Sequence, residues 1–186
     1  MKRIGTCVAG LFLAVLASGT AHAQGGVYRG HATGHAGATF GGDVSGTVFT
    51  AGGSMSVQED SGWGAELDFG FAKDEASLNG GADLTTMMVN VNWIKPAGPV
   101  HPFVVIGVGT IGVHGCLSPC PSITTTWNLG LDWGAGARYD LTDAVSLGGD
   151  IRYFVAPGSH AGTARPENFG FWRVAFGATF SWAIVQ

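Results

Sequence analysis

The feature that most constrains this chain is a strict alternation of side chains in TWNLGLDWGAGARY, residues 126–139. One set of alternate positions is entirely apolar and has aromatic residues at both ends: Trp127, Leu129, Leu131, Trp133, Ala135, Ala137 and Tyr139. The other set is polar or very small: Asn128, Gly130, Asp132, Gly134, Gly136 and Arg138. A period of two residues is typical of a β-strand with two different faces, not of a helix.

The same alternation recurs along the chain and predicts eight strands of roughly 8 to 14 residues. It is clear over residues 63–71, 86–93, 145–153 and 172–182, and weaker around 36–40, 49–57 and 104–108. Turn-forming residues mark short connections at 58–62, 95–99 and 140–144, and longer ones at 73–82, 114–124 and 155–168. The first connection, at 44–47, is expected to be short. This spacing predicts an all-β domain, an eight-stranded antiparallel up-and-down barrel.

Alternation alone does not decide whether such a barrel is soluble or spans a membrane. The apolar faces carry aromatic residues near the strand ends, as in the aromatic girdles of membrane barrels. This predicted girdle comprises Trp63, Trp93, Trp127, Trp133, Tyr139, Tyr153, Trp172 and Trp182. The other faces are rich in glycine, which suits the crowded lumen of a narrow barrel better than a water-facing surface. We therefore expect the apolar faces to contact lipid.

The polar faces hold few charges, and the two signs are nearly balanced. They are Glu66, Asp68, Asp132 and Asp150 against Arg138, Arg152 and Arg173. A solvated face would carry many more charges, whereas charges inside a narrow lumen must find partners. We interpret the set as a paired charge network that fills the lumen. A gate or a proton path is the alternative interpretation.

Composition supports a membrane barrel and excludes some other classes. Charged residues make up only 12% of the chain, apolar residues 46%, and 32 residues are glycine. After the N-terminal segment, no apolar run approaches the roughly 18 residues of a membrane-spanning helix. The net charge of −4 leaves no basic surface for nucleic acid.

The first residues have the pattern of a secretory signal peptide. Lys2 and Arg3 precede an apolar stretch at residues 4–17, and Ala21-His22-Ala23 forms a cleavage site before Gln24. Residues 1–23 are therefore predicted to be removed, and residues 24–186 to form the barrel. Cys116 and Cys120 remain in the exported chain, where a disulfide between them is expected. A metal pair is the weaker alternative, because no second pair of ligands has a suitable spacing.

The exported chain resembles a known family over nearly all of its length, and the clearest marks lie in its second half. The stretches that carry the resemblance are HPFVVIGVGTIGV (101–113), GLDWGAGARYDLTD (130–143), VSLGGDIRYF (145–154) and FGFWRVAFGATFSW (169–182). In this order they resemble strands five to eight of the small outer-membrane β-barrel proteins of Gram-negative bacteria, the group of the OmpA transmembrane domain and OmpX. The resemblance implies an outer-membrane location, contact with outer-membrane lipid, and insertion by the barrel-assembly machinery. The family often ends on an aromatic residue that this machinery reads, and this chain departs from that pattern because it ends WAIVQ. Either Phe180 or Trp182 serves instead, or assembly is less efficient.

Three motifs invite a chemical interpretation. Residues 107–112 match GxGxxG, but no helix is expected to follow, so these are interpreted as strand glycines. His31 and His35 could bind a metal, but they are interpreted as part of a flexible segment before the first strand. Ser159-His160, with Glu167 nearby, could suggest a hydrolase, but adjacent side chains point apart, so an exposed loop is favoured.

These observations predict an integral outer-membrane barrel with a structural or surface-interaction role. We expect no enzymatic activity, cofactor or metal, and any surface ligand would bind the longer loops. A small solute pore is the alternative function. A surface adhesin or a lipid-modifying outer-membrane enzyme fits the sequence less well.

Overall fold

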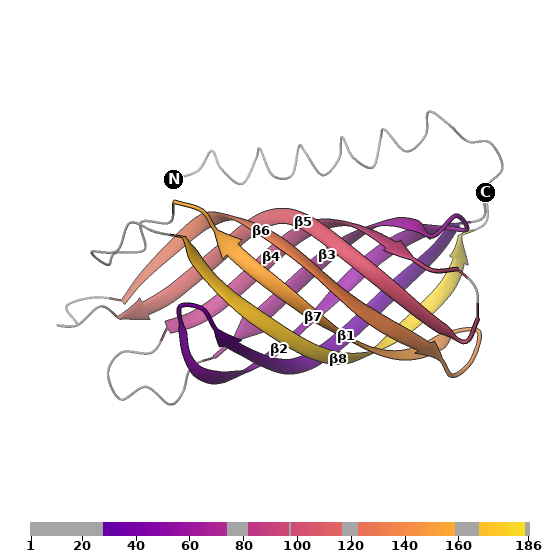
Figure 1. Ribbon diagram of the computed structural model, residues 1–186, viewed down its shortest axis with the longest axis horizontal. Coiled ribbons are helices and arrows are strands. Elements are labelled where there is room, and N and C mark those ends of the chain that lie inside the picture. Colours follow the sequence, from indigo (N-terminus) through magenta and orange to yellow (C-terminus); the bar gives the residue numbers. More distant parts are fainter. Residues whose placement is uncertain (1–27, 74–81, 97, 117–122, 159–167, 185–186) are drawn as a thin grey trace.

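The computed structural model describes residues 28–73, 82–96, 98–116, 123–158 and 168–184. Eight antiparallel strands follow one another in these ranges, and the last pairs with the first, which closes a barrel (Figure 1). The strands are β1 (Tyr28–Gly41), β2 (Val44–Glu59), β3 (Trp63–Ala72), β4 (Ala82–Ile94), β5 (Val100–Cys116), β6 (Ile123–Asp140), β7 (Val145–Ala156) and β8 (Phe169–Ile184). The predicted fold class is confirmed. No helix in the described ranges is long and apolar enough to cross a membrane.

The two ends of the barrel differ in their connections. At one end, called the turn end, residues 60–62, 95–99 and 141–144 join the strands, and both Tyr28 and Ile184 lie there. At the other, called the loop end, β1 and β2 are joined tightly, and the remaining connections span residues 73–81, 117–122 and 157–168. In outer-membrane barrels the short turns face the periplasm and the longer loops face outward.

The first strand is longer than the sequence predicts. His31 and His35 do not precede it but lie within β1, which pairs with β2 on one side and with β8 on the other. The strand is hard to detect because its outward positions from Gly30 to Ala36 are only glycine and alanine, so the alternation carries little apolar contrast. The prediction of a flexible segment containing the two histidines is therefore wrong.

The first connection is also misplaced in the prediction. The chain turns at Gly42 and Asp43, and residues 44–47 already belong to β2. Gly41 and Gly42 have φ angles of 68° and 62°, which glycine adopts readily. The backbone N–H of Asp43 donates to Gly170 O at 2.8 Å, and Asp43 Oδ2 accepts from Gly170 N at 2.9 Å. These bonds to β8 hold the turn in place.

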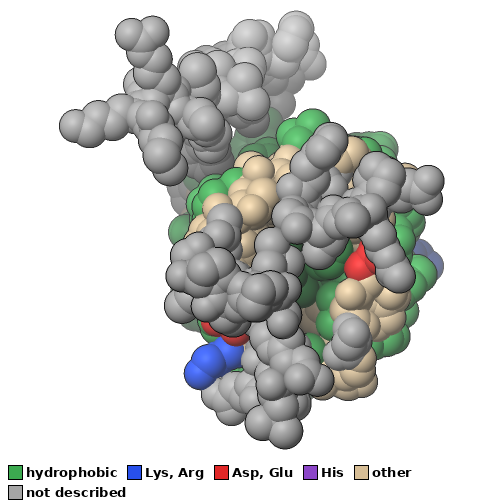
Figure 2. Space-filling view, turned by 90° about the vertical axis from the view of Figure 1, so that its left-hand side faces the viewer, with side chains coloured by type: hydrophobic (Ala, Val, Ile, Leu, Met, Phe, Trp, Pro, Cys, Tyr) green, Lys and Arg blue, Asp and Glu red, His purple; other side chains and the backbone are tan. Residues whose placement is uncertain are grey.

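The outer surface of the barrel is apolar, as the alternation predicts. Phe49, Phe176 and Ile106 are the most open of its large side chains, with exposed fractions of 67%, 71% and 64%. In the view onto the loop end, hydrophobic side chains cover much of the visible wall and few charged side chains are seen (Figure 2). A surface of this composition is stable in lipid and not in water.

The predicted aromatic residues all lie on this outer surface. Seven are exposed, and Tyr153 is half-buried between Trp133 and Trp172, at ring-centroid distances of 5.1 and 4.9 Å. Most are near a strand end, but Trp133 lies in the middle of β6.

Several outward aromatic rings cover a glycine on the neighbouring strand. A Cβ atom on Gly112 would lie 2.9 Å from the ring of Trp127, which is paired with it in register. Trp182 covers its partner Gly30 in the same way. These aromatic side chains therefore shield the exposed backbone of glycines as well as facing lipid.

Candidate functional site

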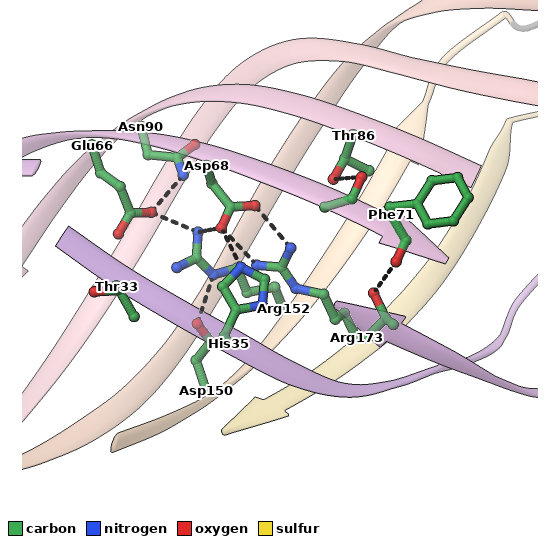
Figure 3. A network of polar contacts seen from close by, with 12 residues as sticks. Thr33, His35, Glu66, Asp68, Phe71, Thr86, Asn90, Asp150, Arg152 and Arg173 are labelled. Atoms are coloured by element: carbon green, nitrogen blue, oxygen red, sulfur yellow. Dashed lines mark hydrogen bonds and ion pairs between the residues drawn. The ribbon is translucent and has the colours of Figure 1, made fainter. Parts of the chain in front are cut away.

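The inward faces of the strands bring most of the predicted charged residues together in the middle of the lumen (Figure 3). We call this group the lumen charge cluster. It comprises His35, Glu66, Asp68, Asn90, Asp132, Asp150, Arg152 and Arg173. It draws on six of the eight strands and is almost completely buried, so charged groups tie together strands that are distant in sequence.

Arg152, on β7, contacts most of the acids. Its Nη1 donates to Glu66 Oε1 at 2.8 Å and its Nε donates to Asp150 Oδ2 at 3.0 Å. Asp132 Oδ2 lies 3.7 Å from the same Nη1 and accepts no hydrogen bond among the described residues. Asn90 Nδ2 donates to Glu66 Oε1 at 2.9 Å. Arg152 therefore links β3, β6 and β7.

Arg173, on β8, forms a bidentate ion pair with one acid, Asp68. Its Nη1 and Nη2 donate to the two oxygens of Asp68 at 2.8 and 3.1 Å. His35 Nε2 lies 3.3 Å from Asp68 Oδ2. A bidentate pair, in which Arg donates two parallel hydrogen bonds to one carboxylate, is among the stronger polar contacts in proteins. Asp68 is fully buried, so removing either partner would leave an uncompensated charge.

Glycines on neighbouring strands, or on a strand across the lumen, make room for the large members of the cluster. A Cβ on Gly70 would lie 2.9 Å from Arg173 Nη1, and one on Gly134 would lie 2.7 Å from Arg152 Cγ. A Cβ on Gly107 would collide with Asn90 Oδ1 and lie 2.5 Å from Asp132 Oδ1. These inward glycines therefore have a specific role, because each of them faces at least one charged or amide side chain.

Toward the loop end, the lumen is filled by apolar side chains. This loop-end plug consists of Val48, Ala72, Leu84, Met88, Ile111, Phe154, Ala156 and Phe171. Phe154 and Phe171 stack with ring centroids 5.0 Å apart, and the Arg173 guanidinium lies 5.0 Å from the Phe154 ring centroid. Arg173 thus marks the boundary between the charge cluster and the plug. Among the described residues, Thr50 and Thr86 add buried hydroxyl groups beside the plug residues Ala72 and Ile111, with which they pair in register.

Toward the turn end, the lumen contains a polar cavity instead. Its lining includes Thr33, Ser54, Glu66, Phe103, Arg138 and Asp150. Its volume is about 60 Å³, room for about four to six water molecules. The cavity ends at the charge cluster, because Arg152 and His35 also line it.

Arg138 is the one predicted network residue that lies apart from the others. Its Nη1 is 3.3 Å from His31 Nδ1, which in turn is 2.8 Å from Ser181 Oγ. Among the described residues, no carboxylate forms an ion pair with Arg138. The predicted paired network therefore includes six of the seven charged residues, and Arg138 forms no ion pair with them within the described part of the chain.

Sequence reasoning missed His35 and Asn90 as members of the cluster. A signal for His35 was present, because His31, Thr33 and His35 alternate with Ala and Gly and so share one face. Asn90 lies on the polar face that the alternation in residues 86–93 defines, but only the charged residues of such faces were selected.

The remaining motifs give no further site. Residues 107–112 lie in β5, with Gly107 facing the lumen, as expected for strand glycines. Cys116 pairs with Ile123 in the backbone register, but its side chain and Cys120 are outside the described residues, as are Ser159, His160 and Glu167. Residues 1–23 are also outside them. In the described part of the chain, no group of His, Cys, Asp or Glu could hold a metal ion.

Comparison with known proteins agrees with the closed membrane barrel described above. The family model described as "outer membrane protein beta-barrel domain" matches residues 6–180. No curated protein matches the sequence.

Several solved structures share the fold at low sequence identity. Neisserial surface protein A is 16% identical, with a TM-score of 0.65, and the alignment covers 83% of this chain and 96% of that one. The N-terminal β-barrel domain of Pseudomonas aeruginosa OprF is 16% identical, with a TM-score of 0.59 and coverages of 84% and 99%. Ail, the attachment invasion locus protein of Yersinia pestis, solved with the heparin analogue sucrose octasulfate, is 14% identical, with a TM-score of 0.56 and coverages of 84% and 99%.

Proposed function

Because the chain belongs to the outer membrane protein β-barrel domain family, we propose that it is a closed barrel that holds its outward loops at the cell surface and conducts no solutes. The outer membrane is its location, as for its structural neighbours. In this proposal the role is structural or in surface interaction.

The observation that carries the proposal is the filling of the lumen. A solute that entered from the turn end would meet the charge cluster, in which Asp68, Arg152 and Arg173 are buried. Beyond it lies the loop-end plug, where Met88, Ile111 and Phe154 have no exposed surface. A hydrated ion cannot pass this plug without losing water, because the apolar side chains of the plug offer no hydrogen bonds in return. A small solute pore is therefore the less favoured function.

The experiment is a solute-uptake assay in liposomes that contain the purified protein. We expect swelling in small sugars and amino acids no faster than in protein-free liposomes. The positive control is the double variant Phe154→Ala/Phe171→Ala, which shortens both stacked rings of the plug. Swelling of wild-type liposomes that depends on solute size would favour the pore.

A surface-interaction role depends on the loop end, and its charge limits the ligand. By sequence, the loop-end connections at 42–43, 73–81, 117–122 and 157–168 contain one lysine, Lys73, and one arginine, Arg165, against Asp43, Asp74, Glu75 and Glu167. A sulfated ligand of the kind bound to Ail is therefore disfavoured here. The test measures how strongly bacterial cells bind to host cells or host protein. It compares bacteria that carry the intact protein with bacteria whose protein is cleaved in 117–122 or 157–168. Equal binding would leave the structural role.

A further inference from the structure

The turn-end cavity places unused charges of opposite sign on different walls. On one side is Arg138, whose guanidinium has no ion-pair partner among the described residues and contacts only His31 Nδ1. Asp140, the acid two residues further on, is held by His101 Nε2 at 2.9 Å. A partly buried guanidinium with no carboxylate at ion-pair distance gains stability from an anionic group that enters the cavity.

The lumen charge cluster beside the cavity contains more carboxylates than guanidinium groups. The lumen charge cluster contains four carboxylates, those of Glu66, Asp68, Asp132 and Asp150, but only the two guanidinium groups of Arg152 and Arg173. Glu66 uses Oε1 for both Arg152 and Asn90, while Oε2 has no hydrogen bond or ion pair in the described structure. In Figure 3 this second oxygen carries no dashed line and points away from Arg152.

Neutral polar groups in the same cavity also lack partners. His35 and Asn92 line it and are both more than nine-tenths buried. His35 Nδ1 and Asn92 Oδ1 make no hydrogen bond within the described residues. Buried polar atoms are rarely left in this state, because each unmet hydrogen bond costs free energy. The cavity therefore has unmet hydrogen-bonding capacity as well as separated charges.

The dimensions of the cavity restrict what could meet these groups. A volume of about 60 Å³ is far below that of a pocket for a drug-sized ligand. Arg138 on β6 and Glu66 on β3 both line this small volume, yet they form no ion pair with each other. A molecule that joins them within this volume must therefore carry its two charged groups on the same carbon atom or on adjacent ones.

We propose that the turn-end cavity binds a small zwitterion of the α-amino acid class. Its carboxylate accepts hydrogen bonds from Arg138, and its ammonium group donates to Glu66 Oε2. The hydroxyl groups of Thr33 and Ser54 line the space around it. An anion alone would leave the second oxygen of Glu66 without a partner, and a cation alone would leave Arg138 without one. The site is independent of the proposed closed barrel, because binding requires entry from the turn end only.

The test is a titration of the protein, extracted from outer membranes in detergent, with glycine as the probe. Acetate and methylamine serve as probes that carry only one of the two charges. Binding is followed by the NMR amide signals of Gly148 and Gly177, which line the cavity, and by calorimetry. We expect saturable shifts with glycine and none with the two singly charged probes. No saturable response to glycine, or equal responses to glycine and acetate, would overturn the proposal.

Matched variants separate the two charged contacts from general electrostatics. Arg138→Gln and Glu66→Gln should each weaken glycine binding at least about tenfold, since each removes a charged hydrogen-bond partner. Lys95→Gln and Asp60→Asn change the same charges on exposed turns at the same end and should leave binding unchanged. If Glu66→Gln fails to fold, Arg138→Gln decides alone, because it breaks no ion pair. Unchanged affinity in Arg138→Gln would overturn the site.

Discussion

The loop half and the turn half of the lumen are lined by the same eight strands, yet they are filled in different ways. In the loop half, apolar side chains such as Phe154, Phe171 and Met88 pack on one another and exclude water. In the turn half, Thr33, Ser54 and Arg138 surround a polar cavity. The charge cluster lies between them, and Arg173 contacts both an acid and an aromatic ring.

The lumen is therefore closed by two different kinds of packing that follow one another along the barrel axis, the lumen charge cluster and the loop-end plug. A charge cluster alone could rearrange and admit ions, because its pairs can exchange partners. An apolar plug alone gives no directional contacts between distant strands. Together, the plug supplies the barrier to ions and the cluster fixes the strands that surround it.

The largest expected effect tests whether the cluster, and not the turn half, stabilises the barrel. Arg173→Ala should lower the free energy of unfolding by about 3–5 kcal/mol, because Asp68 would remain buried with its main partner gone. Arg138→Ala should cost no more than about 1 kcal/mol, since it breaks no ion pair. Urea unfolding in lipid vesicles, followed by tryptophan fluorescence, measures both. Equal losses would show that the two arginines act in the same way.

The next effect tests the packing of the plug. Phe154→Ala should cost about 3–4 kcal/mol, because it removes a stacked ring and leaves a cavity. Phe49→Ala removes the same side chain from the lipid-facing surface, where lipid fills the space, and should cost only about 1–2 kcal/mol. The same unfolding assay applies. A loss at position 49 as large as that at position 154 would mean that the plug is loosely packed.

A smaller effect tests whether lumen glycines make room for the cluster. Gly107→Ala should destabilise the barrel by about 1–3 kcal/mol, because the new Cβ would collide with Asn90 and approach Asp132. Gly34→Ala is the matched control: no atom lies within 4 Å of its added Cβ, so the change should stay within about 0.5 kcal/mol. A neutral Gly107→Ala would show that the cluster relaxes easily and that the tight fit is not needed.

The smallest effect concerns the outer surface near the turn end. Trp182→Ala uncovers the backbone of Gly30, whereas Trp63 covers no glycine among the described residues. Trp182→Ala should therefore cost about 0.5–1.5 kcal/mol more than Trp63→Ala. Thermal unfolding of both variants in the same detergent gives the difference. If Trp63→Ala proved the more costly, covering of glycine would not explain the position of these rings.

The fold could be predicted from the sequence because lipid and lumen impose opposite requirements on alternate residues. In β4, for example, Met87, Val89 and Val91 face outward, while Asn90 and Asn92 face the lumen. The prediction fails where this contrast is weak. β1 has mainly glycine and alanine on its outward face, and both faces of β5 are apolar because Val105 and Ile111 lie inside.

The composition of the candidate site could be predicted, but its pairing could not. Alternation placed Asp68, Arg152 and Arg173 on inward faces, yet it does not say which acid meets which arginine. Asp68 and Arg173 are 105 positions apart in sequence, and the register of the whole barrel brings them together. The separation of Arg138 from the cluster, and the division of the lumen into two halves, depend on the same register.

The most direct test of a sealed lumen is single-channel recording in a planar bilayer. We expect no stable conductance steps for the wild-type protein. We expect conductance steps to appear once Phe154 and Phe171 are both replaced by alanine. Reproducible steps in the wild-type protein, unchanged in the double variant, would contradict it, because ions would then pass by a route that the plug does not control.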